Sequence, residues 1–329
     1  MRATKREFLA GVAGMVALAG LPGRSLAAFP TSAKVGTASQ GGTYFIYGAG
    51  WAQLVQEMTK VNMSSEVTGG PVQNMALVDA GDLEFGKETM GPAYDGWIGE
   101  SELAPGVELR EVRALFPMYQ TPFQMIALES SGIKSSADLN GKTVGVGPRG
   151  GTPGAFFPRF FEDLGIEASI QYGGANDLAG QLKDGLLDCF AFAAGIPISA
   201  FSEIEAERKA TIFTFEPPEI GALLEKYPSL SPFEVPGGTY KGQPNAQTTV
   251  SMWNFAIANK NVDEEFCYEI MKIVLENNDR MMQIHKSAEE TKLENWDKNQ
   301  FLWFHPGAVR YLRDKGVQVP EALIPPEMS

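Results

Sequence analysis

The stretch that most constrains the fold is residues 34–48, KVGTASQGGTYFIYG, in which a short strand pattern runs into a glycine turn and then a helix pattern. Gly41 and Gly42 allow the backbone to turn and to approach a ligand closely. Thr43 then falls at the predicted helix start, where backbone N–H groups lack intrahelical partners and the helix dipole is positive. Such a turn can hold a carboxylate or a phosphate without a charged side chain.

The spacing of this turn imitates a phosphate-binding P-loop, because four residues separate Gly36 from Gly41. Gly42, however, occupies the position where that motif requires Lys, and Thr43 occupies the position of its Ser or Thr. Without the lysine, the turn does not predict a nucleotide site.

A second copy of the same pattern occurs at residues 142–154, KTVGVGPRGGTPG, followed by a helical pattern over 155–164. Either copy alone is explained equally well as an ordinary turn between a strand and a helix. Together they predict an α/β protein with two lobes, whose helix N-termini face each other across a cleft.

The first 27 residues predict an export signal. Lys5 and Arg6 precede a short apolar run over 11–21, and the small residues around Ala27 form a cleavage site. The basic pair resembles a twin-arginine signal with lysine in the first position, and a Sec signal is the alternative. We therefore expect a periplasmic mature protein.

Charge narrows the possible partners. The full chain carries a formal net charge of −13, and removal of the predicted signal, which carries +3, leaves −16. This charge argues against binding to nucleic acid or to anionic lipid. About 300 remaining residues are enough for two domains with a large core.

Polar residues between the two glycine turns predict more of the cleft rim. A helix is expected from Pro71, which places Asn74 in its first turn beside the first glycine turn. A strand expected over 83–85 is followed by Lys87, Glu88 and Thr89. Ligands of open α/β sheets lie beyond the carboxyl ends of strands, so all three residues are candidates for the rim and Thr89 is the favoured one. For Lys87 and Glu88 the alternative is a solvated pair, which is the commoner fate of adjacent opposite charges.

Two long apolar segments predict the crossings between the lobes. Residues 113–128 contain two strand-like halves around 120–122, and residues 247–260 offer a return strand. The predicted lobes are therefore 28–121 with 261–329, and 122–260. Cys189 and Cys267 then fall in different lobes, and we expect two buried thiols rather than a disulfide.

The chain resembles the TAXI-type solute receptors of TRAP transporters, which are periplasmic proteins of a sodium-coupled uptake system. Six ordered motifs carry the resemblance: GTASQGGTYFIYG, TGGPVQNMALVDAGDLEFG, SGIKSSADLNGKTVGVGPRGGTPG, LLDCFAFAAGIPISA, PGGTYKGQ and FHPGAVRYLRDKG. The resemblance implies a type II, Venus-flytrap binding protein without catalysis or cofactor. It would pass a small organic anion, of the glutamate, dicarboxylate or keto-acid class, to a fused membrane permease.

The resemblance also implies a binding site built from both glycine turns and the strand ends between them. The candidate ligand-binding residues are Ser39, Gly42, Thr43, Tyr44, Asn74, Thr89, Arg149, Gly151, Thr152, Phe192 and Gly195. Arg149 is the strong cation within the second turn, where it either grips a ligand carboxylate and favours dianions or faces solvent. The chain departs from the family pattern at 89–91 and at 149–151, which leaves the ligand open.

Two other classes of function compete with transport. Gly145, Gly147 and Gly150 satisfy a dinucleotide-binding pattern, but no clear acidic partner follows, so an exported oxidoreductase is the weaker hypothesis. His285 and His305 lack metal-ligand spacing, so no metal is expected. A periplasmic ligand sensor without a transport role cannot be separated from a transport receptor by sequence.

Overall fold

The computed structural model describes residues 29–328, and the predicted signal peptide lies outside them. The strands are β1 Ser32–Gly36, β2 Asn62–Glu66, β3 Phe85–Thr89, β4 Val112–Leu128, β5 Thr143–Gly145, β6 Ser169–Gln171, β7 Cys189–Ala193, β8 Ala210–Phe213, β9 Ser231–Val235 and β10 Gln247–Asn259. The helices are α1 Thr43–Thr59, α2 Pro71–Asp79, α3 Met90–Trp97, α4 Thr152–Leu164, α5 Ala175–Lys183, α6 Ser199–Glu207, α7 Pro217–Lys226, α8 Glu264–Glu276, α9 Asn278–Ile284 and α10 Pro306–Asp314.

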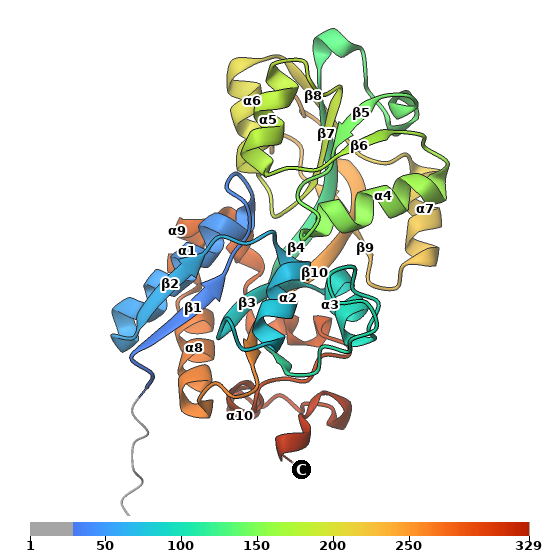
Figure 1. Ribbon diagram of the computed structural model, residues 1–329. Coiled ribbons are helices and arrows are strands. Elements are labelled where there is room, and N and C mark those ends of the chain that lie inside the picture. Colours follow the sequence, from blue (N-terminus) through green and yellow to red (C-terminus); the bar gives the residue numbers. More distant parts are fainter. Residues whose placement is uncertain (1–28, 329) are drawn as a thin grey trace, which may run out of the picture.

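Strands β4 and β10 connect the two halves of the molecule (Figure 1). They pair antiparallel along most of their length, in a sheet of order β2-β1-β3-β10-β4-β7-β5-β6. The predicted break at 120–122 does not occur. Thr121 and Pro122 are extended and pair with Met252 and Ser251 of β10. Pairing with this long strand keeps β4 continuous through Pro122.

The buried side chains form clusters that divide along these two strands. One cluster combines residues between 33 and 119 with residues between 255 and 323. The others draw almost entirely on residues between 123 and 252. We call the elements around the first cluster the first lobe (β1–β3, α1–α3 and α8–α10) and those around the others the second lobe (β5–β9 and α4–α7). The lobe limits read from the sequence stay a prediction.

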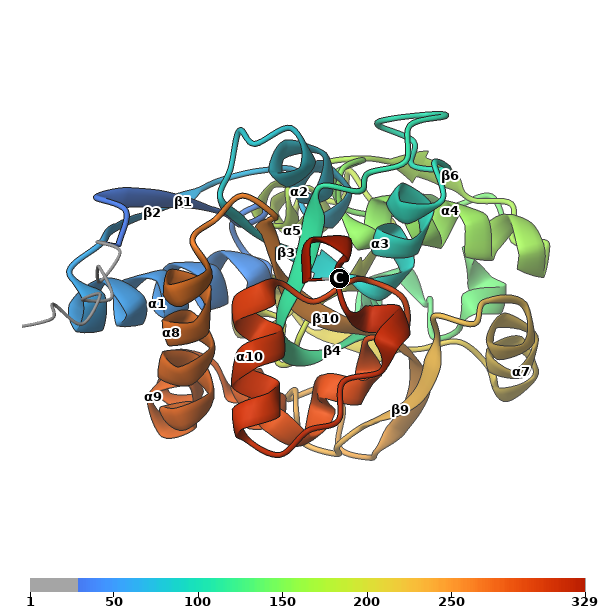
Figure 2. The same cartoon turned by 90° about the horizontal axis from the view of Figure 1, so that it is seen from below.

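Each lobe is a sheet covered by helices on both faces. In the first lobe, α1, α8 and α10 lie on one face of the strands and α2 and α3 on the other (Figure 2). Trp51 of α1 is fully buried and packs edge-on against Phe85 and Phe116. In the second lobe, the aromatic face of α4 packs on β4, where Phe160 lies 5.1 Å from Phe123 between ring centroids.

Both cysteines are buried and free, which confirms the expected thiols. Cys267 belongs to the cluster of the first lobe and Cys189 to a cluster of the second. Within residues 29–328, no helix combines the length and the apolar character that a membrane crossing requires.

His305 is a structural hydrogen-bonding residue. It is 1 % exposed, its Nδ1 accepts from the N–H of Gly307 at the start of α10, and its Nε2 lies 3.1 Å from the carbonyl of Val262. Burial lowers the pKa of this imidazole from 6.5 to about 4. The folded protein therefore holds His305 neutral at a pH where the unfolded chain protonates it.

We expect His305→Asn to reduce the loss of stability on acidification. As pH falls below 6.5, the unfolded state takes up the proton first, so the native form loses about 2 kcal/mol through this group between pH 7 and pH 5. Asparagine can still cap α10 but does not titrate. Urea unfolding at both pH values should give a smaller pH effect in the variant; an equal effect would contradict the assigned role of His305.

Candidate ligand site between the lobes

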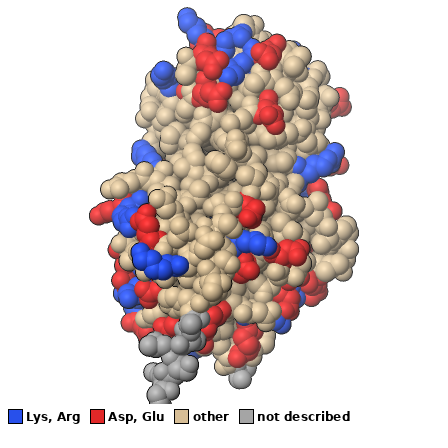
Figure 3. Space-filling model, turned by 60° about the vertical axis from the view of Figure 1, so that its left-hand side comes forward, with Lys and Arg blue, Asp and Glu red and all other residues tan. Residues whose placement is uncertain are grey.

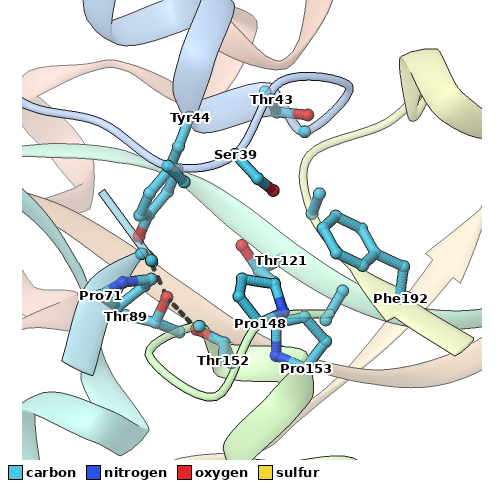
Figure 4. Close-up of a pocket in the computed structure, with 17 residues that line it drawn as sticks. Ser39, Thr43, Tyr44, Pro71, Thr89, Thr121, Pro148, Thr152, Pro153 and Phe192 are labelled. Atoms are coloured by element: carbon cyan, nitrogen blue, oxygen red, sulfur yellow. Dashed lines mark hydrogen bonds between the residues drawn. The ribbon is translucent and has the colours of Figure 1, made fainter. Parts of the chain in front are cut away.

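A cavity of about 40 Å³ lies between the lobes (Figure 4). Residues of the predicted site form part of its wall, and uncharged residues that the sequence did not single out form the rest. The lining residues are Ala38, Ser39, Gly42, Thr43, Tyr44, Gly69, Gly70, Pro71, Thr89, Thr121, Pro148, Gly151, Thr152, Pro153, Phe192, Ala193 and Ala194.

Four helices begin at this cavity. The residues that precede α1, α2, α3 and α4 are Gly42, Gly70, Thr89 and Gly151, and all four line the cavity. None of them caps its helix through a side-chain hydrogen bond. The positive ends of four helix dipoles therefore converge on one small volume, an arrangement that favours a negative charge there.

A chain of hydroxyl groups crosses the cavity from one lobe to the other. The Thr152 hydroxyl donates to Thr89 Oγ1 at 2.8 Å, and the Thr89 hydroxyl donates to Asn254 Oδ1 at 2.8 Å. The Tyr44 hydroxyl also donates to Asn254 Oδ1. The amide nitrogen of Asn254 donates to the carbonyl of Tyr119 and to Thr121 Oγ1. Asn254 thus acts as an acceptor that fixes the direction of these hydroxyl protons.

Thr43 also bonds across the lobes. Its hydroxyl was expected to point at the ligand, but it donates to the carbonyl of Gly195 at 2.6 Å, and Thr43 is 1 % exposed. The carbonyl of Ile196 accepts from Ser287 nearby. Gly195 is therefore a contact for the facing lobe and is not among the lining residues.

The loop over 39–42 closes one side of the cavity by capping helices of the other lobe. Its carbonyl groups accept from the N–H of Asn176 at the start of α5 and of Ala200 at the start of α6. On another side, Gly70 at the start of α2 meets Gly151 of the second glycine turn. A Cβ on Gly70, whose φ is +119°, would lie 2.9 Å from Gly151 Cα. Glycine at these positions lets the two backbones meet.

Two other predicted residues lie outside the cavity wall. Asn74 is fully buried, and its amide donates to the carbonyls of Thr37 and Lys87, which ties α2 to the strands. Arg149 is exposed, and its guanidinium stacks on Tyr172 with the carbon 3.8 Å from the ring centroid. Their roles as ligand-binding residues stay predictions.

Lys87 and Glu88 do not form a solvated pair. Strand β3 runs to Thr89 instead of ending at Phe85, and both residues are fully buried within it. Lys87 Nζ donates to the carbonyl of Gly36 at 2.8 Å and lies 5.7 Å from the Tyr44 ring centroid. Burial lowers the pKa of Lys87 and raises that of Glu88, so the interior favours the neutral form of both.

The charged side chains near the cleft pair with one another. Arg159 of α4 reaches Asp95 of α3 at 2.7 Å and Glu102 at 3.4 Å, so these ion pairs join the lobes outside the cavity. On the face in Figure 3, charges gather toward both ends of the molecule and are sparse across its middle. Among residues 29–328, no group of three or more His, Cys, Asp and Glu side chains is arranged to hold a metal.

The glycines of the dinucleotide-like pattern have packing roles. A Cβ on Gly145 would lie 2.8 Å from the side chain of Leu187, and one on Gly147 would lie 2.9 Å from Phe192. Gly150 abuts the backbone of Gly69 in the first lobe. Packing against Leu187 and Phe192 and contact between the lobes therefore account for all three glycines.

Several lining residues were missed because their sequence signal is weak. Pro71, Pro148 and Pro153 read as turn and helix-start residues. Asn254 does not line the cavity but anchors the lining hydroxyls of Tyr44 and Thr89, and it reads as one polar residue within an apolar strand. A polar residue in the middle of a buried strand is the signal that could have identified Asn254, since such a group requires partners.

Comparisons with known proteins place the chain in a family. Residues 35–316 match the model of the NMT1-like family, so this protein belongs to the NMT1-like family. It is similar to a structure described as a periplasmic transporter, with 11 % identity and a TM-score of 0.50 over 79 % of this chain and 87 % of that one.

Two further structures are similar at lower TM-scores. A substrate-binding protein of an ABC uptake transporter from Streptococcus pneumoniae, with bound histidine, shares 14 % identity at a TM-score of 0.48, over 79 % of this chain and 94 % of that one. The alkanesulfonate-binding protein from Xanthomonas axonopodis pv. citri shares 12 % identity at 0.46, over 87 % and 85 %. The predicted α/β fold of the type II binding-protein kind is confirmed by the two-lobed arrangement of the described elements and by the similarity at a TM-score of 0.50.

We expect Thr43→Val to loosen the contact between the lobes. The substitution keeps the shape of the side chain but leaves the Gly195 carbonyl buried without its donor, which should lower the free energy of unfolding by about 1–3 kcal/mol. Thr43→Ser retains the hydroxyl and is the matched control. Urea unfolding measures the change, and X-ray scattering should give a larger radius of gyration for the valine variant. Unchanged stability without added ligand would instead assign the hydroxyl to the ligand.

Proposed function

We propose that this protein is an extracytoplasmic solute receptor that captures a small organic anion between its lobes and delivers it to a membrane transport component. The observation that carries the proposal is the convergence of four helix N-termini on one cavity between the lobes. The NMT1-like family and the binding-protein fold agree with it. Residues 1–27, with the features of an export signal, support a periplasmic location.

Capture requires that the lobes separate and close again. Among the elements of residues 29–328, only β4 and β10 run through both lobes. The register of their pairing shifts between Trp253 and Phe255 and again between Phe255 and Ile257. We infer that bending occurs at these irregular positions. The hydrogen bonds from α5 and α6 to the loop over 39–42, and the contact of Gly70 with Gly151, would then form on closure. They would shield the anion from water.

The binding chemistry uses the backbone rather than charged side chains. Helix α1 belongs to the first lobe and α4 to the second. The N–H groups in their first turns would donate to a carboxylate once the lobes close. The hydroxyls of Tyr44, Thr89 and Thr152 lie beside this position, so they would orient the rest of the ligand. Because both lobes contribute, ligand binding stabilises the closed form.

We propose a TRAP transporter of the TAXI type as the partner, on the strength of the six sequence motifs. Uptake of labelled ligand by cells with and without the gene tests this proposal. Uptake that depends on the gene and stops when the sodium gradient is collapsed supports the proposal. Uptake that requires ATP and persists without the sodium gradient would instead assign the receptor to an ABC transporter. A ligand that binds but is not taken up would favour a sensor.

Binding of matched carboxylates and amides tests the anion site. We expect propionate to bind at least about tenfold more tightly than propionamide, because the helix N-termini favour the charged oxygen pair over a neutral group of the same shape. Isothermal titration calorimetry measures both ligands. Equal affinities would contradict an anion site, and mass spectrometry of ligand released from native protein would then identify the class that does bind.

A further inference from the structure

The described residues that line the cavity carry no ionisable acid or base other than the phenol of Tyr44. From this we propose that the site selects a small monoanion with a short uncharged tail and rejects dicarboxylates and amino acids. The inference rests on the proposed function, because it concerns the ligand of the same site. It narrows the class of organic anion to which the sequence pointed.

The cavity offers a place for one negative charge only. The four helix starts supply partial positive charge, and proline, alanine and phenylalanine side chains form much of the remaining wall. A second carboxylate would be removed from water without a cation to pair with it, which is unfavourable. Arg149, the cation of the second glycine turn, does not pair with such a carboxylate, because it is exposed and stacks on Tyr172.

An ammonium group finds no partner either. No Asp or Glu is among the described lining residues, so the positive group of an amino acid would lose water without gaining a carboxylate. Glu88 precedes Thr89 on β3 but is not among the lining residues. Its Oε1 accepts from the N–H of Thr89, and its Oε2 is buried without a hydrogen-bond partner among the described residues.

The size of the cavity limits the tail of the ligand. Its volume of about 40 Å³ is far below the roughly 150 Å³ of a cavity that accommodates benzene. Phe192 sets this limit, because its ring is held between the lobes. A Cβ on Gly42 in one lobe would lie 3.5 Å from Phe192 Cε1, and a Cβ on Gly147 in the other would lie 2.9 Å from Cε2. The ring thus contacts both glycine turns and occupies the space into which a longer tail would extend.

The test is a calorimetric panel of propionate, hexanoate, succinate and alanine on the wild-type protein. We expect propionate to bind at least about tenfold more tightly than each of the other three, since an unpaired buried charge or an overlong tail has no compensating contact. Binding of succinate or alanine as tight as that of propionate would overturn the inference while leaving the receptor function intact. If no panel member or native ligand binds, the proposed function itself fails.

Substitution of Phe192 tests the size limit. Phe192→Ala should improve hexanoate relative to propionate by about tenfold, because it removes the ring that blocks the tail. Phe161→Ala is the control: Phe161 is equally buried in the second lobe but does not line the cavity. Circular dichroism verifies folding, and Phe192→Leu, which keeps more of the packing, gives the same comparison should the alanine variant unfold. An unchanged preference in the folded Phe192 variant would overturn the assignment.

Arg149→Gln separates this inference from the alternative in which Arg149 grips a second carboxylate. We expect the order of affinities across the panel to stay unchanged, because the guanidinium stacks on Tyr172 outside the cavity wall. A selective loss of succinate binding would show that Arg149 turns into the cleft and would overturn the exclusion of dicarboxylates.

Discussion

The antiparallel pairing of β4 with β10 is the interaction on which the rest of the molecule depends. Each strand begins in one lobe and ends in the other, and their shared ladder carries the chain across the boundary twice. The hydrophobic clusters end where this ladder passes between the lobes, on either side of Thr121 and Asn254. The paired strands hold the two lobes beside the cavity, and their register shifts are the positions at which the proposed bending would occur.

The cavity lies where this ladder meets the helix starts. Asn254 is central to the arrangement because it ties the carbonyl of Tyr119 and the hydroxyls of Tyr44 and Thr89 into one network. Through Thr152 the network continues into the other lobe. The polar groups of the site are therefore anchored to the strands that connect the lobes, so closure brings Thr152 to a hydroxyl already oriented in the first lobe.

Burial of Lys87 and Glu88 shows how the surroundings decide the state of a charged residue. In the sequence they are adjacent opposite charges after a short strand, which is typical of a solvated pair. In the fold, β3 continues through them between β1 and β10, so both side chains lie in the interior. Lys87 fits because Gly48 of α1 has no side chain: a Cβ there would lie 1.9 Å from Lys87 Nζ. No local pattern around residues 85–89 carries that information.

Local sequence patterns were enough to predict the two glycine turns that each lead into a helix, the helix start at Pro71 and the two segments that cross between the lobes. These follow from backbone rules that act over a few residues, namely glycine freedom, proline at a first helical position and apolar periodicity. Tertiary structure decided what faces the cavity. It directed Thr43 to Gly195, placed Arg149 on Tyr172, brought Pro148 to the cavity wall and set Asn254 behind the hydroxyls of Tyr44 and Thr89. Those positions depend on contacts between residues far apart in the chain.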